Sequence, residues 1–321
     1  MPANLTPQYY EAESKYKKAS TPEERIEALQ EMLKVIPKHK GTEKLQGEIK
    51  KRIAKMKEEG KKKKQTKGFD PFGVEREGAG QVVLAGYPNT GKSSLVGSLT
   101  RAKVKIADYP FATPLPISGM MPYKDTFIQL VDTPPVMVDN IPSGIIGTYK
   151  EADALLILVD VSTAECLEQM DGIIQIMQER EVIDLYGEED VLTPIPFILL
   201  AHKIDHPDAE ENLEVLQELW PELEFVKVSS NGQGLEELKE SIYQILDIIR
   251  IYGKSPEREA DMERPFVLKK GSTVIDFAEQ VHRDFPDKLK SALVWGSSKF
   301  DGQAVARDYV LEDGDIVELQ L

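Results

Sequence analysis

The stretch GYPNTGKS at residues 86–93 decides the fold of this chain, because it matches the pattern G-x-x-x-x-G-K-[ST]. It follows a short apolar run at 81–85 and precedes a helical pattern at 93–99, which is the setting of a phosphate-binding P-loop. Glycines let backbone N–H groups curl around a phosphate, and the start of the following helix adds positive dipole. The sequence therefore predicts a nucleotide site at this loop.

Two side chains of the loop have specific expected roles. We expect Lys92 to reach the β- and γ-phosphates, which makes it a candidate catalytic residue, and the Ser93 hydroxyl to bind Mg²⁺. The full set of expected nucleotide-binding residues in this segment is Gly86, Tyr87, Pro88, Asn89, Thr90, Gly91, Lys92, Ser93 and Ser94.

The pattern around the loop predicts an α/β domain. Helical patterns at 93–99, 163–180 and 234–249 are interspersed with five apolar runs, at 81–85, 127–131, 154–159, 196–200 and 225–228. Continuous apolar runs are typical of strands that are buried on both faces. Their alternation with helices predicts a parallel sheet with helices on both sides.

Two further segments provide candidate Mg²⁺ ligands. Asp132 follows the second strand in the sequence DTPP, where an aspartate can hold Mg²⁺ through water. Pro135 stands where a glycine N–H usually binds the γ-phosphate, and proline has no N–H to offer. Thr113, in the sequence FAT at 111–113, is a candidate magnesium ligand and a second candidate catalytic residue.

The sequence HKID at 202–205 follows the fourth strand and predicts recognition of guanine. The Asp205 carboxylate can accept hydrogen bonds from guanine N1–H and its 2-amino group, a donor pair that adenine lacks, so GTP and GDP are expected rather than ATP. Lys203 can cover the base with its stem. His202 replaces the usual asparagine and can tie the P-loop to this HKID loop. The loop after the fifth strand contributes the remaining expected base contacts, Ser229, Ser230 and Asn231.

The two ends of the chain predict separate domains. Residues 1–67 predict a helical hairpin, with one helix opening at Thr21 and ending before Pro37, a second opening at Thr42, and a lysine linker. Residues 68–253 form the expected nucleotide-binding domain. Residues 254–321 contain a linker and a strand–helix–strand pattern that predicts a small β-grasp domain.

Charge and composition limit the kinds of partner and the cellular compartment that we expect. The net charge is −15, yet the segment from 34 to 67 carries +10, from fourteen Lys and Arg against four Glu. This segment is either a contact for a polyanion such as RNA or a solvated helix with a flexible linker. A single cysteine, Cys166, and the lack of any apolar run near the roughly 20 residues that span a bilayer favour the cytoplasm. We expect contact with neither membrane nor DNA.

The motifs, together with DYPFAT at 108–113, resemble those of the Obg-type GTPases, and most closely the developmentally regulated GTP-binding protein branch. The C-terminal region resembles the TGS domain of that branch in the segments VHRD at 281–284, ALVWGSS at 292–298 and VLEDGD at 310–315. The resemblance implies a GTPase that hydrolyses GTP to GDP and phosphate and acts with ribosomes or RNA. It also implies a TGS domain that can bind a protein partner, and a K⁺ ion held near Asn89.

Departures from the family pattern leave two functions open. Pro135, His202 and Ala112 replace usual motif residues, and 73 positions separate Asp132 from Asp205, fewer than an inserted domain needs. Val136 also stands where a water-orienting glutamine would be in Ras-like enzymes. The chain is therefore either a slow GTPase switch or a module that holds nucleotide with little hydrolysis.

Overall fold

A computed structural model describes residues 8–9, 12, 15–16, 22–36, 42, 46–47, 49–53, 72–100, 115–185, 193–256 and 258–321. The chain divides into two compact units, Met1–Asp70 and Pro71–Leu321. Across these residues, no helix is both long enough and apolar enough to pass through a bilayer.

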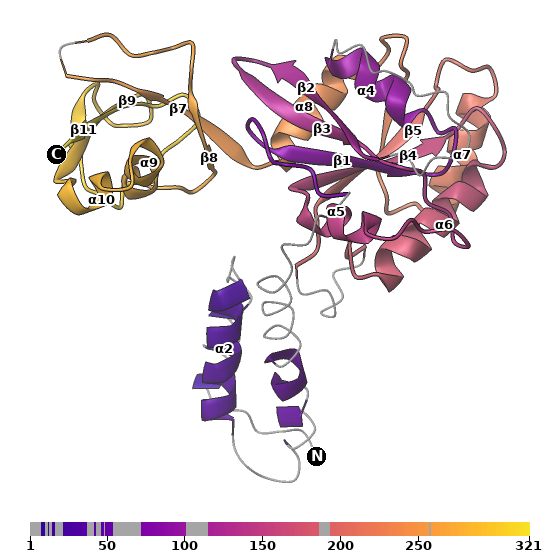
Figure 1. Ribbon diagram of the computed structural model, residues 1–321, viewed down its shortest axis with the longest axis horizontal. Helices are drawn as coiled ribbons and strands as arrows, with labels where there is room; N and C mark the ends of the chain where they lie inside the picture. The colour runs from indigo at the N-terminus through magenta and orange to yellow at the C-terminus, as the bar shows by residue number, and fades with distance from the viewer. Residues whose placement is uncertain are drawn as a thin grey trace. The chain divides into compact units, whose positions relative to one another are not determined.

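The first unit contains the helix that was predicted to open at Thr21. This helix, α2, spans Pro22–Val35 (Figure 1). Its apolar positions Leu29 and Met32 are buried, as their helical spacing predicts. Residues 46–47 and 49–53 are also helical, and Ile49 and Ile53 are buried. Several parts of the predicted hairpin and its linker lie outside the described residues, among them Thr21, Pro37 and the lysine run at 61–64.

The second unit begins with a six-stranded sheet in the order β2-β3-β1-β4-β5-β6. Its strands are β1 (Gln81–Gly86), β2 (Ile117–Tyr123), β3 (Thr126–Asp132), β4 (Ala154–Asp160), β5 (Phe197–His202) and β6 (Phe225–Val228). All neighbours pair in parallel except β2, which is antiparallel to β3. Every residue of β1 and β4 is buried, which explains why these strands read as unbroken apolar runs.

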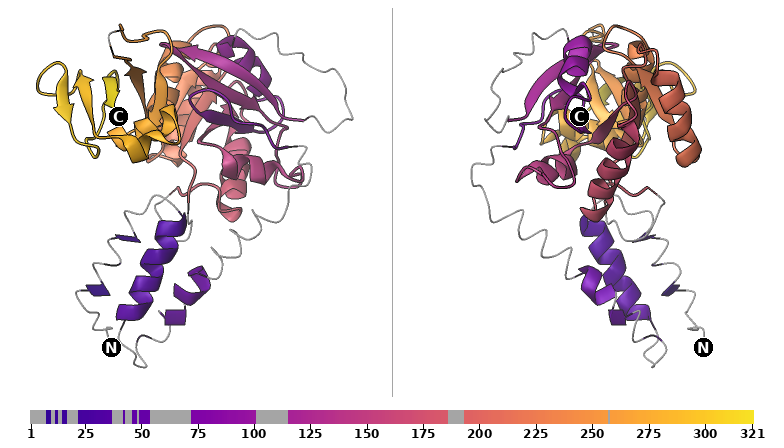
Figure 2. Two further views of the ribbon diagram at one scale, coloured as in Figure 1. Left: turned by 60° about the vertical axis from the view of Figure 1, so that its left-hand side comes forward. Right: turned by 90° about the vertical axis from the view of Figure 1, so that its right-hand side faces the viewer.

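Helices cover both faces of this sheet (Figures 1 and 2). Val83 and Ala85 of β1 face one core, shared with α5 (Ile145–Glu151), α6 (Cys166–Glu179) and α7 (Ala209–Leu219). Val82 and Leu84 face the other, shared with α4 (Lys92–Thr100) and α8 (Leu235–Ile245). The predicted fold, a P-loop domain with a mostly parallel sheet, is confirmed.

A second sheet has the order β10-β9-β11-β7-β8. Its strands are β7 (Ile248–Gly253), β8 (Phe266–Lys269), β9 (Ser291–Trp295), β10 (Gln303–Val305) and β11 (Ile316–Gln320). Helices α9 (Val274–Val281) and α10 (Phe285–Lys288) accompany it. Phe277 and Ala278 of α9 belong to the buried core of this layer, together with Ile251, Val294 and Val317. This module is the predicted C-terminal domain.

The predicted helix at 234–249 is wrong at its C-terminal end. Helix α8 stops at Ile245, and Asp247 has a positive φ of 49° that turns the chain. Residues 248–253 then form β7, which pairs with β8 and β11 of the second sheet. This strand therefore lies inside the segment 68–253 predicted for the nucleotide-binding domain but builds the C-terminal sheet.

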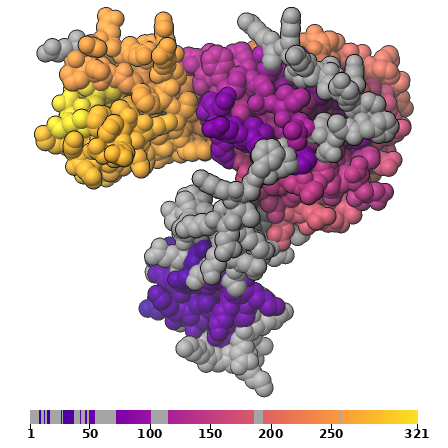
Figure 3. Space-filling model, in the orientation of Figure 1, coloured from indigo at the N-terminus to yellow at the C-terminus, as the bar shows by residue number. Residues whose placement is uncertain are grey.

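An arginine joins the two sheets of the second unit, whose surfaces lie against each other in Figure 3. Arg250 of β7 pairs with Asp125, in the turn between β2 and β3, at 2.6 Å, and with Asp313, in the loop before β11, at 2.8 Å. The Tyr252 hydroxyl also donates to Asp125, and the Tyr243 hydroxyl donates to Asp313 at 3.1 Å. The hydrogen bond from the Arg250 guanidinium to Asp313 is the main cause that raises the pKa of Arg250.

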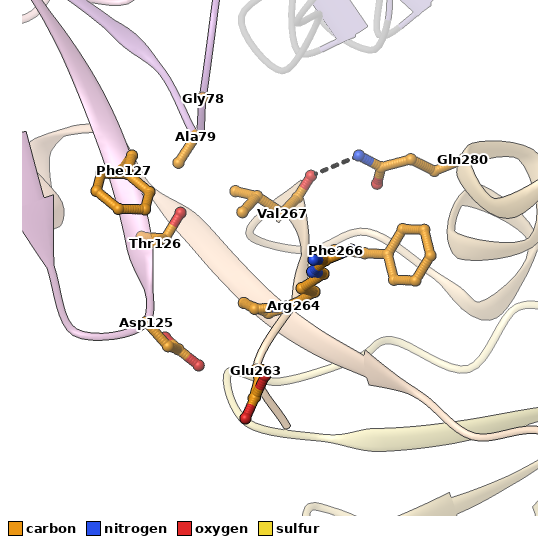
Figure 4. A pocket seen from close by; sticks show the side chains of 11 residues that line it. Gly78, Ala79, Asp125, Thr126, Phe127, Glu263, Arg264, Phe266, Val267 and Gln280 are labelled. Carbon is orange, nitrogen blue, oxygen red and sulfur yellow. Dashed lines mark hydrogen bonds between the residues drawn. The ribbon is translucent and has the colours of Figure 1, made fainter. Parts of the chain in front are cut away.

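A cavity of about 450 Å³ lies beside this junction. Figure 4 shows Thr126 and Phe127 on one wall and Phe266 and Val267 on the other. It is at the start of β3, whereas the predicted magnesium ligand Asp132 ends that strand. The cavity is therefore separate from the predicted nucleotide site.

Candidate nucleotide-binding site

The P-loop connects β1 to α4 without any intervening residue beyond the motif itself, since β1 ends at Gly86 and α4 begins at Lys92. Asn89 and Gly91 have positive φ angles of 63° and 93°. Glycine adopts such angles without strain, and asparagine tolerates them better than most residues. A Cβ atom at Gly86 would lie 2.9 Å from the Leu158 carbonyl oxygen, so this position packs tightly against β4.

Lys92 points back into the loop from the first turn of α4. Its Nζ donates to the carbonyl oxygens of Gly86 at 3.0 Å and Tyr87 at 2.9 Å. Burial lowers the pKa of Lys92 to about 8, and the Asp132 carboxylate opposes that shift. The hydrogen-bond partners of the lysine at the loop are therefore neutral carbonyl oxygens. A bound anion such as a phosphate would supply the negative charge that its ammonium lacks.

Ser93 and Asp132 meet beside the loop. The Ser93 hydroxyl donates to Asp132 Oδ2 at 2.5 Å, while Oδ1 is buried without a hydrogen-bond partner. Burial raises the pKa of Asp132, because the charged form lacks solvation. The Ser93 hydroxyl and the Asp132 carboxylate, whose Oδ1 has no partner, form an oxygen donor set that suits Mg²⁺, which takes oxygen ligands. Of the predicted magnesium ligands, Thr113 lies outside the described residues.

The segment after Asp132 is bound to the P-loop. Thr133 Oγ1 donates to the Leu84 carbonyl at 2.6 Å, and the Val136 N–H donates to the Gly86 carbonyl at 3.2 Å. The Val136 side chain is fully buried in the core that includes Val83. The Val136 side chain therefore cannot reach a water molecule at the phosphates. The Val136 N–H, which is the first N–H after Pro135, is already bonded to Gly86.

His202 forms the predicted tie between its own loop and the P-loop, and it also contacts the loop after β6. Its Nδ1 lies 2.7 Å from the Thr90 carbonyl oxygen, and because a carbonyl only accepts, Nδ1 carries the proton. Its Nε2, 2.9 Å from Ser230 Oγ, then accepts from that hydroxyl. Burial lowers the pKa of His202, which keeps the ring neutral. The ring also fills the space beside Gly91, where a Cβ atom would lie 2.6 Å from Nδ1.

The Asp205 carboxylate, which was predicted to read guanine, is exposed and hydrogen-bonded to Ser229. Ser229 Oγ donates to Asp205 Oδ1 at 2.5 Å, and this bond is the main reason that the pKa of Asp205 lies below its usual value. The Asn231 N–H also contacts Ser229 Oγ at 3.4 Å. Lys203, in the left-handed region with φ of 66°, pairs its amine with Asp160. The loop therefore presents a charged carboxylate to solvent.

The predicted site residues from β1, β3, β5 and β6 gather at the carboxyl ends of these strands. The Tyr87 side chain is an exception, because a Cβ atom at Gly172 of α6 would collide with its hydroxyl, so the side chain points toward that helix. Ser94 accepts a hydrogen bond from Ser98 within α4 through its carbonyl. Sequence reasoning missed Asp160, which ends β4 in the same way that Asp132 ends β3.

Comparisons with known proteins agree with this geometry. Residues 81–203 match the family described as 50S ribosome-binding GTPase, and residues 249–320 match the TGS domain. An uncharacterised GTP-binding protein of Methanocaldococcus jannaschii is 30% identical over 362 residues, covering 92% of each chain. Developmentally-regulated G-protein 2 of Arabidopsis thaliana is 28% identical, over 92% of this chain and 90% of that one. Ribosome-interacting GTPase 1 of Saccharomyces cerevisiae is 27% identical, over 94% and 99%.

Proposed function

This chain belongs to the developmentally regulated GTP-binding protein family, and from that premise we propose that it is a slow, Mg²⁺-dependent GTPase switch acting with ribosomes or RNA-associated partners. The observation that carries the proposal is Asp132, whose buried Oδ1 has no partner although Ser93 and Lys92 stand beside it. Such an oxygen is costly to bury unless a cation or a donor arrives.

The site residues divide the work between phosphate and base. Lys92 and the loop N–H groups would bind the phosphates, with Ser93, Asp132 and Thr113 as the residues that would hold Mg²⁺. The ion would supply charge neutralisation at the phosphate oxygens. Asp205 and Lys203, with Ser229, Ser230 and Asn231, would read and cover the guanine. His202 holds the two halves of the site together through Thr90 and Ser230.

Replacing Asp205 by asparagine tests guanine recognition. We expect the native protein to bind GDP at least about tenfold more tightly than ADP, since a lost charged hydrogen-bonding group costs at least about 1.4 kcal/mol. Asp205→Asn should remove most of that preference, as an amide presents a donor where guanine needs an acceptor. Calorimetry with both nucleotides measures it, and Asp208→Asn, an exposed carboxylate on the same loop, is the control. Equal affinity of the native protein for GDP and ADP contradicts guanine recognition.

Hydrolysis separates the switch from the second candidate, a module that holds nucleotide with little turnover. That alternative is favoured by the buried Val136 side chain and by Pro135, which offers no N–H to the γ-phosphate. We expect slow phosphate release in single-turnover assays with Mg²⁺, faster in KCl than in NaCl if Asn89 helps hold K⁺. Equal rates in the two salts exclude the potassium site. No release above the uncatalysed rate in either salt supports the nucleotide-holding module.

Association with ribosomes or RNA in the cytoplasm rests on the segment from 34 to 67, with its charge of +10, and on the name of the yeast relative. We expect co-sedimentation with ribosomes that weakens steeply with salt, because phosphate contacts release counterions. Deleting residues 1–67 should remove this association while leaving GDP affinity unchanged, since unit Pro71–Leu321 holds the site. Unchanged association after deletion would instead direct the search to a protein partner of the TGS domain.

A further inference from the structure

We propose that Asp160 is a positioning residue for guanine recognition: it holds the Lys203 ammonium away from Asp205, and so keeps the Asp205 carboxylate free for the base. The inference rests on the proposed function, in which Asp205 reads guanine. It assigns a role to a side chain that belongs to none of the nucleotide-binding motifs.

The sheet places Asp160 next to the guanine-reading loop. Asp160 is the last residue of β4, and in the parallel pairing of β4 with β5 it lies opposite His202. The Val161 N–H donates to the His202 carbonyl at 3.1 Å, so the pairing continues one residue past the strand. The Asp160 N–H is bound to Gln169 of α6 at 2.9 Å. The carboxylate is therefore fixed at the strand end beside Lys203.

The Asp160 carboxylate is almost completely removed from water, with 5% of the residue exposed. Oδ1 accepts from the Ser162 N–H at 3.0 Å and from its hydroxyl at 2.6 Å. Oδ2 is paired with the Lys203 ammonium. A buried carboxylate is stable when it is paired and hydrogen-bonded, and removing its partner is costly. This ion pair is therefore a fixed feature of the loop rather than an exposed, exchanging contact.

Lys203 is constrained at both its backbone and its amine. Its φ of 66° lies in the left-handed region, which costs a residue with a side chain roughly 1–2 kcal/mol. The ion pair directs the side chain inward toward β4, yet 36% of the side chain remains exposed. The exposed part is the portion that is available to cover a base.

Asp205 is the competing carboxylate. It lies two residues after Lys203 in the same loop, is exposed, and accepts a hydrogen bond from Ser229. A lysine has a flexible stem with a compact charge, so a Lys203 amine without Asp160 would be attracted to Asp205. That pairing would occupy the oxygens that guanine N1–H and its 2-amino group require. Asp160 prevents it by providing a buried partner that holds the Lys203 ammonium.

The test is the affinity ratio of GDP to IDP, because IDP lacks only the 2-amino group that Asp205 reads. Dissociation constants for GDP, IDP and ADP are measured by calorimetry for the full chain and for Asp160→Asn, which keeps the size of the side chain and an oxygen for Ser162. We expect Asp160→Asn to weaken GDP by about tenfold, to bring the GDP-to-IDP ratio close to one, and to leave ADP unchanged.

Two further variants exclude a merely structural effect. Asp153→Asn removes a carboxylate that is also salt-bridged, to Arg76 at 2.9 Å, but lies before the start of β4, and it should leave all three affinities unchanged. Adding Lys203→Met to Asp160→Asn keeps an apolar stem and removes the released charge, so it should restore the GDP-to-IDP ratio. If Asp160→Asn fails to fold, Ser162→Ala, which removes one donor to the carboxylate, should shift the ratio in the same direction by less.

The outcomes separate this inference from the proposed function. An unchanged GDP-to-IDP ratio in Asp160→Asn, with the native preference for GDP over ADP intact, overturns the role of Asp160 alone. If the added Lys203→Met change does not restore the GDP-to-IDP ratio, the idea that the released Lys203 amine competes with guanine for Asp205 is overturned. A native protein that binds GDP and ADP equally overturns guanine recognition itself, and the inference falls with it.

Discussion

Replacing Lys92 by alanine is expected to weaken the binding of GTP and GDP by at least about 30-fold. The Lys92 amine is buried at the P-loop, where it donates to two carbonyl oxygens. The negative charge of Asp132 is close enough to stabilise its charged form. Losing one partner of a buried, hydrogen-bonded charge pair costs about 2–5 kcal/mol, or roughly 30-fold to several thousand-fold in affinity. Calorimetry with Mg²⁺ and each nucleotide measures the loss. Normal binding by Lys92→Ala would place the nucleotide pocket elsewhere in the molecule.

The free protein provides the control for folding. Burial lowers the pKa of Lys92 to about 8, so at pH 7 the folded protein carries a charge that its surroundings disfavour. We therefore expect the ligand-free Lys92→Ala protein to melt no lower than the native protein, which separates lost binding from lost structure. Lys150→Ala, at an exposed position in the last turn of α5, should change neither binding nor melting.

Replacing Gly91 by alanine should produce the largest loss of stability in the site. Its φ of 93° disfavours any side chain, and the new Cβ would lie 2.6 Å from His202 Nδ1. Left-handed strain costs roughly 1–2 kcal/mol and overpacking about 1–3 kcal/mol, so we expect a total of about 2–5 kcal/mol. The ring must move, which breaks its bonds to Thr90 and Ser230 and weakens GDP binding too. Denaturant unfolding and calorimetry measure the two effects.

Gly271 offers a matched control for that variant. Its φ of 85° is similar, but nothing lies within 4 Å of a Cβ atom built there. Gly271→Ala therefore carries the backbone strain alone, roughly 1–2 kcal/mol. The difference between the two variants is the contact with His202. Equal losses of unfolding free energy in Gly91→Ala and Gly271→Ala would show that the His202 ring moves aside at no cost. If the ring resists, adding His202→Asn, which has a shorter side chain, to Gly91→Ala should recover part of the loss.

The sequence was sufficient to locate five of the six strands of the first sheet and to place the P-loop, Asp132 and His202 at one edge of it. Strands β1 and β4 are buried on both faces, so their sequences QVVLAG and ALLILVD are apolar without interruption. Because parallel strands end at one edge of a sheet, motifs that follow successive strands must come together there. The P-loop, Asp132 and His202 could therefore be assigned to one site before any coordinates were known.

Other features depend on neighbours that are distant in the sequence. Strand β2, ISGMMPY, contains Gly119 and Pro122, which are tolerated because it is an edge strand, and it was not predicted. Strand β7 was read as the end of a helix because its isoleucines continue the apolar spacing of α8. The direction of Tyr87 and the partner of Asp160 depend on α6 and on the pairing of β4 with β5, which no local pattern encodes.

The Arg250 junction has a consequence for how this protein could have been assembled by recombination. Strand β7 completes the second sheet, yet its arginine is also bonded to Asp125 in the hairpin of the first. If the chain were divided before Ile248, Asp125 in the first part would lose its ion pair with Arg250. If it were divided after Gly253, the second sheet would lose β7, which lies between β8 and β11. Neither break yields two intact halves. A C-terminal module exchanged between relatives would therefore have to match the residue at position 125 of the recipient, a constraint that disfavours exchange of this module alone.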